Sequence, residues 1–228
     1  MMLENALFDF CKAKLATGTG WYDWKINWDK VPAGIAKTHG NDYEQNVALK
    51  NALSADWQAG DASRRRDLEH YYIAVWGGVR TNSPDKLQMY FGNTDAENIA
   101  LGKSGIASWS KALTVRDPRK HAIYDARVGA ALSALQIRDR VAHPVRFPLL
   151  LSRNTLIASR NPMLKQWADE HHWPAISPSF YSDYLDLCRK TTTRLRAEVR
   201  DIDVQIYTVE MVLFAHAEAL VWAALPTA

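Results

Sequence analysis

The chain has 228 residues, with 28 lysines and arginines against 25 aspartates and glutamates, for a formal net charge of +3. Hydrophobic residues make up 47% and charged residues 23% of the chain, which is typical of a soluble globular protein and excludes a disordered, fibrous or membrane-spanning one. The two cysteines, Cys11 and Cys188, cannot form a disulfide framework, so we expect a protein of the reducing cytoplasm. An acid near the N-terminus, Glu4, argues against a signal peptide.

The spacing of apolar residues predicts an all-α protein, a single globular domain over residues 1–228 made of two helical lobes with a central cleft. Strand patterns are scarce, and His121–Tyr124 is the best short candidate. The most apolar run, Met211–Leu225, is too short for a membrane span of about 20 residues, and we expect no membrane contact. In chain order, the predicted helices are Glu4–Leu15, Asn41–Ser54, Ser63–Trp76, Asp95–Leu101, Ser108–Val115, Asp125–Ile137, Asn161–Glu170, Tyr181–Arg196 and Asp203–Trp222.

The positive charge is concentrated in the middle of the chain. Between Lys103 and Lys165 there are twelve basic residues and three acids, a net charge of +9, whereas the rest of the chain carries −6. Large fields of one sign are usually avoided unless they serve a purpose, so this pattern predicts a face that binds a polyanion. The alternative is that these side chains only solvate helix surfaces.

Overlapping this basic segment, residues of about 95–137 read as helix, glycine turn, helix, short connection and a further helix that begins at an Asp. The small residues of the turn Gly105-Ile106-Ala107 let the backbone approach a ligand closely, and amides at the start of the following helix, near Ser108, can bind phosphate. Asp125 lies at the start of the last helix. An acid at that position is also a common helix cap.

This arrangement resembles the helix-hairpin-helix DNA glycosylase superfamily. The hairpin matches at Ser104–Ala107, with Ala107 in place of the family's second glycine, and the segment around the family's aspartate matches at Ile123–Val128. The resemblance covers roughly 35 residues. The matching segment also looks similar to that of short bacterial members of the superfamily, which act in antiviral defence by removing modified bases from viral DNA.

The resemblance implies that Asp125 is the catalytic carboxylate, which stabilises positive charge on the deoxyribose and activates water after the base is flipped from the duplex. Lys111 would be the nucleophile if the enzyme also cuts the strand, although Trp109 stands nearer to the position where such enzymes place their lysine. Phosphate binding and a solvated surface position are the other readings of Lys111. The implied partner is double-stranded DNA with a damaged or modified base, bound by a monomer that needs no cofactor or metal.

Several further residues are candidates for contact with DNA. By their position, Gly105, Ile106, Ala107 and Ser108 would bind phosphate, as would Arg127 and Arg153. Trp24, Trp76, Arg80 and Trp109 could line a base pocket, since aromatic rings stack on bases. A structural aromatic cluster, with Gly77-Gly78 as a helix stop, is the alternative reading.

Two other functions compete with the glycosylase. The segment Arg138-Asp139-Arg140-Val141-Ala142-His143 resembles the motif of the HEPN ribonucleases, in which Arg138 would stabilise phosphate charge and His143 would act as acid or base. A DNA-binding helical protein without enzymatic activity would use the same basic face, with Asp125 as a cap only.

Overall fold

The computed structural model describes residues 1–225 and confirms the all-α class. The described residues contain eleven α-helices and no strand, and the structure is 63% helical. The strand prediction for His121–Tyr124 is therefore wrong, because this extended segment has no neighbouring strand with which to pair. The described residues divide into two compact helical units, one of residues 1–18 and 124–225 and the other of residues 19–123.

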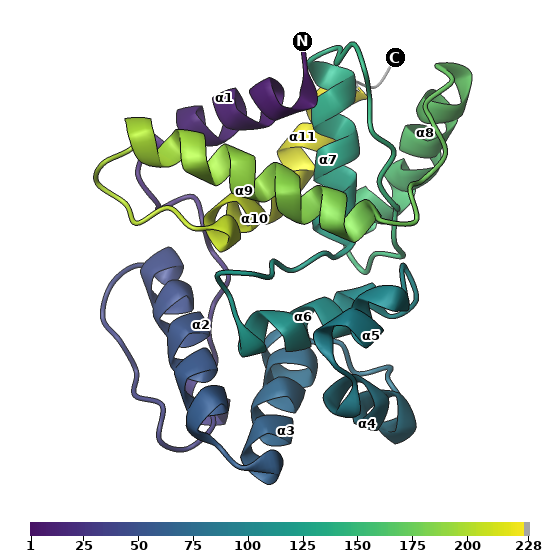
Figure 1. Ribbon diagram of the computed structural model, residues 1–228. Coiled ribbons are helices and arrows are strands. Elements are labelled where there is room, and N and C mark those ends of the chain that lie inside the picture. Colours follow the sequence, from purple (N-terminus) through teal and green to yellow (C-terminus); the bar gives the residue numbers. More distant parts are fainter. Residues whose placement is uncertain (226–228) are drawn as a thin grey trace. The chain divides into compact units, whose positions relative to one another are not determined.

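The first unit is built around the apolar helix α7 (Ala126–Arg138), in which every residue from Val128 to Ile137 is buried. The last helix of the chain, α11, packs along α7, and α8 and α10 contact it too. Figure 1 shows α1 and α9 lying side by side in this unit, in agreement with their contacts. The other helices of the unit are α1 (Leu3–Leu15), α8 (Thr155–Glu170), α9 (Phe180–Glu198), α10 (Ile206–Ala215) and α11 (Ala217–Ala224).

The second unit packs α2 and α3 against α6, and its core includes Leu49, Leu53, Leu68 and Val115. Its α-helices are α2 (Asp42–Ala59), α3 (Ala62–His70), α4 (Pro84–Gly92), α5 (Asp95–Ala100) and α6 (Ile106–Arg116), and a short 3₁₀ helix, η1, covers Trp28–Lys30. A π-helical segment, η2 (Tyr71–Trp76), continues α3, with the Gly77 amide bonded to the Tyr72 carbonyl five residues back. Such segments are rare and often occur at functional sites.

Several elements differ from the sequence prediction. The helix α4 was not expected, although Ser83 followed by Pro84 is a good helix start, and the Ser83 hydroxyl accepts from the Lys86 amide. Helix α8 begins at Thr155 rather than at Asn161, since Asn154 caps it and Pro162 lies inside it. The predicted helix Ser63–Trp76 changes to π geometry at Tyr71, and the predicted helix Asp203–Trp222 breaks at His216 into α10 and α11.

No single described helix is long and apolar enough to cross a membrane. The pair α10 and α11 reaches that length and composition only when the two helices are taken together, and they are bent by 58° at their break.

Candidate functional site

Asp125 is the N-cap residue of α7, as its position in the sequence predicts. Its Oδ1 accepts hydrogen bonds from the amides of Arg127 at 2.9 Å and Val128 at 3.1 Å. Both bonds fall on the same oxygen, and within residues 1–225 no group donates to Oδ2. The carboxylate is partly exposed and held in one orientation by the start of a buried helix. This geometry holds the carboxylate through one oxygen and leaves the other without a donor among the described residues.

A small polar network follows Asp125 in the same unit. Arg127 Nη2 donates to Glu218 Oε1 at 2.8 Å, and Asn154 Nδ2 donates to the same oxygen at 2.8 Å. The Arg127 guanidinium also lies 5.0 Å from the centre of the Phe214 ring, in a cation–π contact. The network joins the first turn of α7 to α11 and to the start of α8. Arg127 is therefore a positioned cation, and Glu218 is a member of the site that sequence reasoning missed.

Arg153 is exposed and lies one residue before Asn154, a member of this network. Within the described residues its guanidinium has no hydrogen bond or ion pair. Its guanidinium would thus not have to give up another bond to contact a phosphate.

The predicted hairpin is the turn between α5 and α6 in the second unit. Gly102 and Gly105 both adopt left-handed backbone conformations, with φ of 58° and 69°. Trp109 closes the turn by donating its indole N–H to the Ser104 carbonyl at 3.1 Å. The first helical bonds of α6 come from the Ser108 and Trp109 amides to the Gly105 carbonyl, so the Ile106 and Ala107 amides precede them.

Not every residue predicted in the hairpin can touch a ligand in this conformation. Trp109 is 0% exposed, so its ring offers no surface to a base and serves the turn instead. Ser108 is 2% exposed, and its hydroxyl accepts from the Asn82 side chain at 2.8 Å. The Ile106 side chain is buried too. The backbone amides at Ile106 and Ala107, with the exposed Gly105, are what remains for phosphate binding.

Lys111 is buried rather than solvated, with 3% of its surface exposed, which excludes the surface reading. Its Nζ donates to the Ala107 carbonyl one turn earlier in α6, at 2.7 Å. The chain passes close to it, since a Cβ on Gly77 would lie 2.5 Å from Lys111 Cε. The lack of a side chain at Gly77 thus allows the chain to pass close to Lys111, and Gly77 also ends the helical segment η2.

Trp24 and Trp76 lie together, with ring centroids 5.9 Å apart. Trp76 stacks on Tyr72 at 4.2 Å, donates its indole N–H to Asn46 Oδ1 at 2.8 Å, and lies 5.3 Å below the buried Lys50 ammonium. These contacts describe a structural cluster around η2, one edge of which remains partly exposed. Arg80 is exposed nearby in the sequence, four residues after Trp76.

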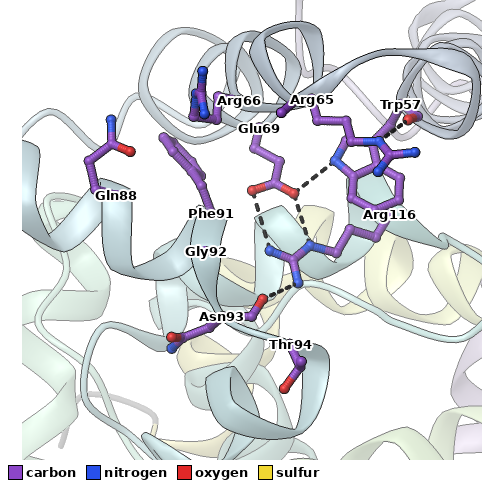
Figure 2. Close-up of a pocket in the computed structure, with 11 residues that line it drawn as sticks. Trp57, Arg65, Arg66, Glu69, Gln88, Phe91, Gly92, Asn93, Thr94 and Arg116 are labelled. Carbon is purple, nitrogen blue, oxygen red and sulfur yellow. Dashed lines mark hydrogen bonds and ion pairs between the residues drawn. The ribbon is translucent and has the colours of Figure 1, made fainter.

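Figure 2 shows a pocket whose lining residues all belong to the second unit. The volume of the pocket is about 400 Å³. Its floor is an ion pair between Arg116 and Glu69, with Nε and Oε1 2.9 Å apart, and Trp57 donates to the same oxygen at 2.9 Å. Arg116 also donates to Asp95 and to the Tyr90 and Asn93 carbonyls. Burial raises the pKa of the Glu69 carboxyl, and the bonds to Arg116 offset only part of that effect.

Each nitrogen of the Arg116 guanidinium therefore already has an acceptor, and the pair joins α3 to α6 and to the start of α5. We read it as a structural ion pair of the second unit. No sequence pattern identified Glu69 or Arg116, because the two residues are 47 positions apart.

The residues of the rival ribonuclease motif are not arranged as that motif prefers. Arg138 ends α7 and holds the Asp139 carboxylate with two bonds, at 2.6 and 2.7 Å, while its guanidinium lies over Phe10. His143 lies outside the helix and is exposed. Arg138 is thus engaged by its own neighbour, and His143 lacks the helical context.

The described residues contain no group of three His, Cys, Asp or Glu side chains that could hold a metal ion. Comparison with known proteins gives no match: no family model, no curated protein and no solved structure is similar to this chain.

Proposed function

We propose that the protein is a DNA glycosylase that removes a damaged or modified base, with Asp125 as the catalytic carboxylate. The observation that carries the proposal is the cap geometry: two amides fix Oδ1 of Asp125, while Oδ2 has no donor within the described residues. The resemblance of Ile123–Val128 and of the hairpin to the helix-hairpin-helix glycosylases supports the same assignment.

The chemistry needs a fixed negative charge of this kind. Cleavage of the N-glycosidic bond leaves the bonding electrons on the base and builds positive charge at C1′ of the deoxyribose. A carboxylate beside C1′ stabilises that charge, and its open oxygen can accept a proton from the attacking water. The water oxygen then bonds to C1′ as the bond from C1′ to the base nitrogen breaks, and the departing base takes up a proton from the solvent while the carboxyl releases the one it accepted.

The α5–α6 hairpin has its own part in the proposal. Its glycines allow a close backbone approach, and the Ile106 and Ala107 amides begin a helix, where the partial positive charge favours a phosphate. Arg127, two residues after Asp125, and the exposed Arg153, one residue before Asn154, supply further cations in the same unit. Defence against modified viral DNA, a cytoplasmic location and action as a monomer remain part of the proposal.

The burial of Lys111 argues against strand cutting as part of the proposed activity. Its Nζ is buried and bonded to the Ala107 carbonyl, whereas a Schiff-base nucleophile must reach C1′ as a neutral amine. We therefore expect simple hydrolysis, and borohydride treatment of the reaction should trap no covalent protein–DNA adduct.

The test is an oligonucleotide panel with damaged and modified bases, including glucosylated hydroxymethylcytosine, in which free base is measured. The wild type should release one of them, and Asp125→Asn should lower the rate roughly 10²–10³-fold. Because Asn caps a helix as well as Asp does, the variant removes the charge and keeps α7 intact.

Asp61→Asn is the matched control. Asp61 caps α3 in the other unit, with Oδ1 accepting from the Arg64 amide at 2.9 Å, so the same chemical change there should leave the rate unaltered. Full activity in Asp125→Asn would refute the assignment. RNA cleavage that is lost in His143→Ala and kept in Asp125→Asn would favour the ribonuclease, and DNA binding without any base release would favour the non-enzymatic alternative.

A further inference from the structure

The pocket of the second unit (Figure 2) has two kinds of polar group: those bonded within the protein and those that are not. The bonded groups include its floor, where Glu69 accepts hydrogen bonds from both Arg116 and Trp57. The Asn93 and Thr94 side chains are bonded as well, each to a residue of α5. Recognition of a ligand would therefore depend on the rest of the lining.

Two adjacent arginines of α3 line the pocket without a carboxylate partner. Arg65 lies over the Trp57 ring, 4.6 Å from its centroid, and donates to the Trp57 and Gln58 carbonyls at 3.0 and 3.4 Å. Both acceptors are neutral, so the charge of Arg65 is not offset by them. Arg66 is exposed, and within residues 1–225 it has no hydrogen bond or ion pair. Asp61, the N-cap of α3, attracts both cations from a longer distance.

The charge of the lining favours an anion. Glu69 is the one acid among the described lining residues, and its pairing with Arg116 leaves the floor without net charge. Arg65 and Arg66 therefore give the pocket two positive charges. A guanidinium presents paired N–H groups that match the oxygens of a phosphate. Two such groups suit a phosphate monoester, which carries a charge of about −1.5 to −2 near pH 7.

The wall opposite Trp57 adds a flat apolar surface and a carboxamide. Phe91 and Gln88 are three residues apart in α4, and Figure 2 shows both at one side of the Glu69–Arg116 ion pair with Trp57 at the other. Two guanidinium groups already contact the Trp57 ring. Within the described residues the half-buried Phe91 ring has no aromatic or cationic partner, and the Gln88 carboxamide has no hydrogen bond. Both groups are thus available to a ligand.

We propose that this pocket binds a nucleoside monophosphate, with the phosphate on Arg65 and Arg66, the base against Phe91 and the edge of the base on Gln88. Aromatic rings stack on every base, and a glutamine side chain forms paired hydrogen bonds with base edges. The volume of about 400 Å³ is within the usual range of about 300–1,000 Å³ for small-molecule sites. The inference goes beyond the proposed function, because no lining residue is assigned a part in base excision.

The test is isothermal titration calorimetry of the full chain with the four nucleoside 5′-monophosphates, their nucleosides and inorganic phosphate. At least one nucleotide should bind with a dissociation constant below about 1 mM and about 10-fold or more tightly than its nucleoside, because the phosphate contacts are charge-assisted. Arg66→Gln should weaken the nucleotide about 10-fold and change the nucleoside less than about 2-fold.

Lys86→Gln is the matched control for the loss of one charge. Lys86 is an exposed residue of α4 that does not line the pocket, so its substitution should leave nucleotide binding unchanged. Urea denaturation of each variant checks that the fold is retained.

Two further variants separate the base from the phosphate. Phe91→Leu keeps an apolar side chain and removes the ring, so it should weaken the nucleotide about 5–10-fold and leave inorganic phosphate unaffected. Gln88→Ala should reduce the differences in affinity among the four bases.

The phosphorylated nucleoside can be a free nucleotide or the 5′ end of a DNA strand, and oligonucleotides with a 5′-phosphate or a 5′-hydroxyl distinguish the two. A preference for the 5′-phosphate that Arg66→Gln removes identifies the strand end, and equal binding of the two oligonucleotides identifies the free nucleotide.

The proposal is overturned if no nucleotide binds, if nucleosides bind as tightly as nucleotides, or if Arg66→Gln has no more effect than Lys86→Gln. These measurements require no base release, so their failure leaves the proposed function standing.

Discussion

The hairpin of the second unit offers a direct test of why its glycines are required. Gly102 and Gly105 have nearly the same left-handed backbone, with φ of 58° and 69°, so an alanine is strained at either position. Their surroundings differ. A Cβ on Gly102 would meet nothing within 4 Å, whereas a Cβ on Gly105 would lie 1.9 Å from the hydroxyl oxygen of the buried Tyr90.

The two substitutions should therefore differ in cost. Gly102→Ala carries only the left-handed strain, about 1 kcal/mol of unfolding free energy. Gly105→Ala adds an overlap with a packed side chain, which costs a further 1–3 kcal/mol, for a total of about 2–4 kcal/mol. Tyr90→Phe in the Gly105→Ala background removes the overlapping oxygen and leaves a ring carbon at 2.9 Å, so part of the loss should return.

Urea denaturation followed by tryptophan fluorescence measures these differences, with the slope of unfolding free energy against urea compared between variants. Trp109, bonded to the Ser104 carbonyl in the same turn, makes the signal sensitive to the hairpin. Equal losses in Gly102→Ala and Gly105→Ala would refute the reasoning, because backbone strain alone would then set the cost. The same holds if Tyr90→Phe restores nothing.

Two further predictions concern buried charge. Arg116→Met leaves the Glu69 carboxylate buried without its partner and should cost about 3–5 kcal/mol in urea denaturation, and adding Glu69→Leu should recover much of it; a single variant as stable as the double one would contradict this. Burial, with a smaller effect from Lys14, lowers the pKa of His216 to about 4. Between about pH 6.5, the ordinary pKa of histidine, and about pH 4, the unfolded state therefore binds more protons than the folded state. The unfolding free energy should fall as the pH falls through this window, and His216→Gln should make that fall smaller. Parallel pH profiles for His216→Gln and wild type would contradict the assignment.

Local patterns predicted much of the fold because helices are governed by local periodicity and caps. The helix at α7 and its cap at Asp125 follow from one Asp before an apolar stretch, and the structure has both. The start of α8 was placed too late because Pro162 suggests a first turn, whereas the Asn154 cap allows the helix to begin earlier and to pass through the proline.

The candidate site was only partly accessible to such patterns. Asp125 and the hairpin are contiguous features, so a short stretch of sequence identifies them. The polar partners of the Arg127 network are not contiguous: Asn154 and Glu218 are 64 residues apart, and no pattern in either segment indicates the other. The sequence also could not distinguish an exposed Trp109 from a buried one, since both fit the same helical pattern.

The charge pattern changes its meaning in the fold. The basic excess between Lys103 and Lys165 suggested a broad polyanion-binding face, yet half of its twelve basic residues are ion-paired: Arg116, Lys120, Arg127, Arg138, Arg146 and Lys165. Several of the acids in these pairs come from outside the segment, namely Glu69, Asp95, Asp169 and Glu218.

The separation of charge along the sequence is thus partly undone by packing, since the acidic remainder supplies partners to the basic middle. A guanidinium that already binds a carboxylate must give up that bond, or share it, before it can neutralise a phosphate. Four exposed basic residues of the segment have no ion pair within residues 1–225: Lys103, Arg119, Arg140 and Arg153. Two of them adjoin residues of the proposed function in the sequence, Lys103 before Ser104 of the hairpin and Arg153 before Asn154, so the proposed contact with DNA would depend on a few placed cations rather than on a general positive field.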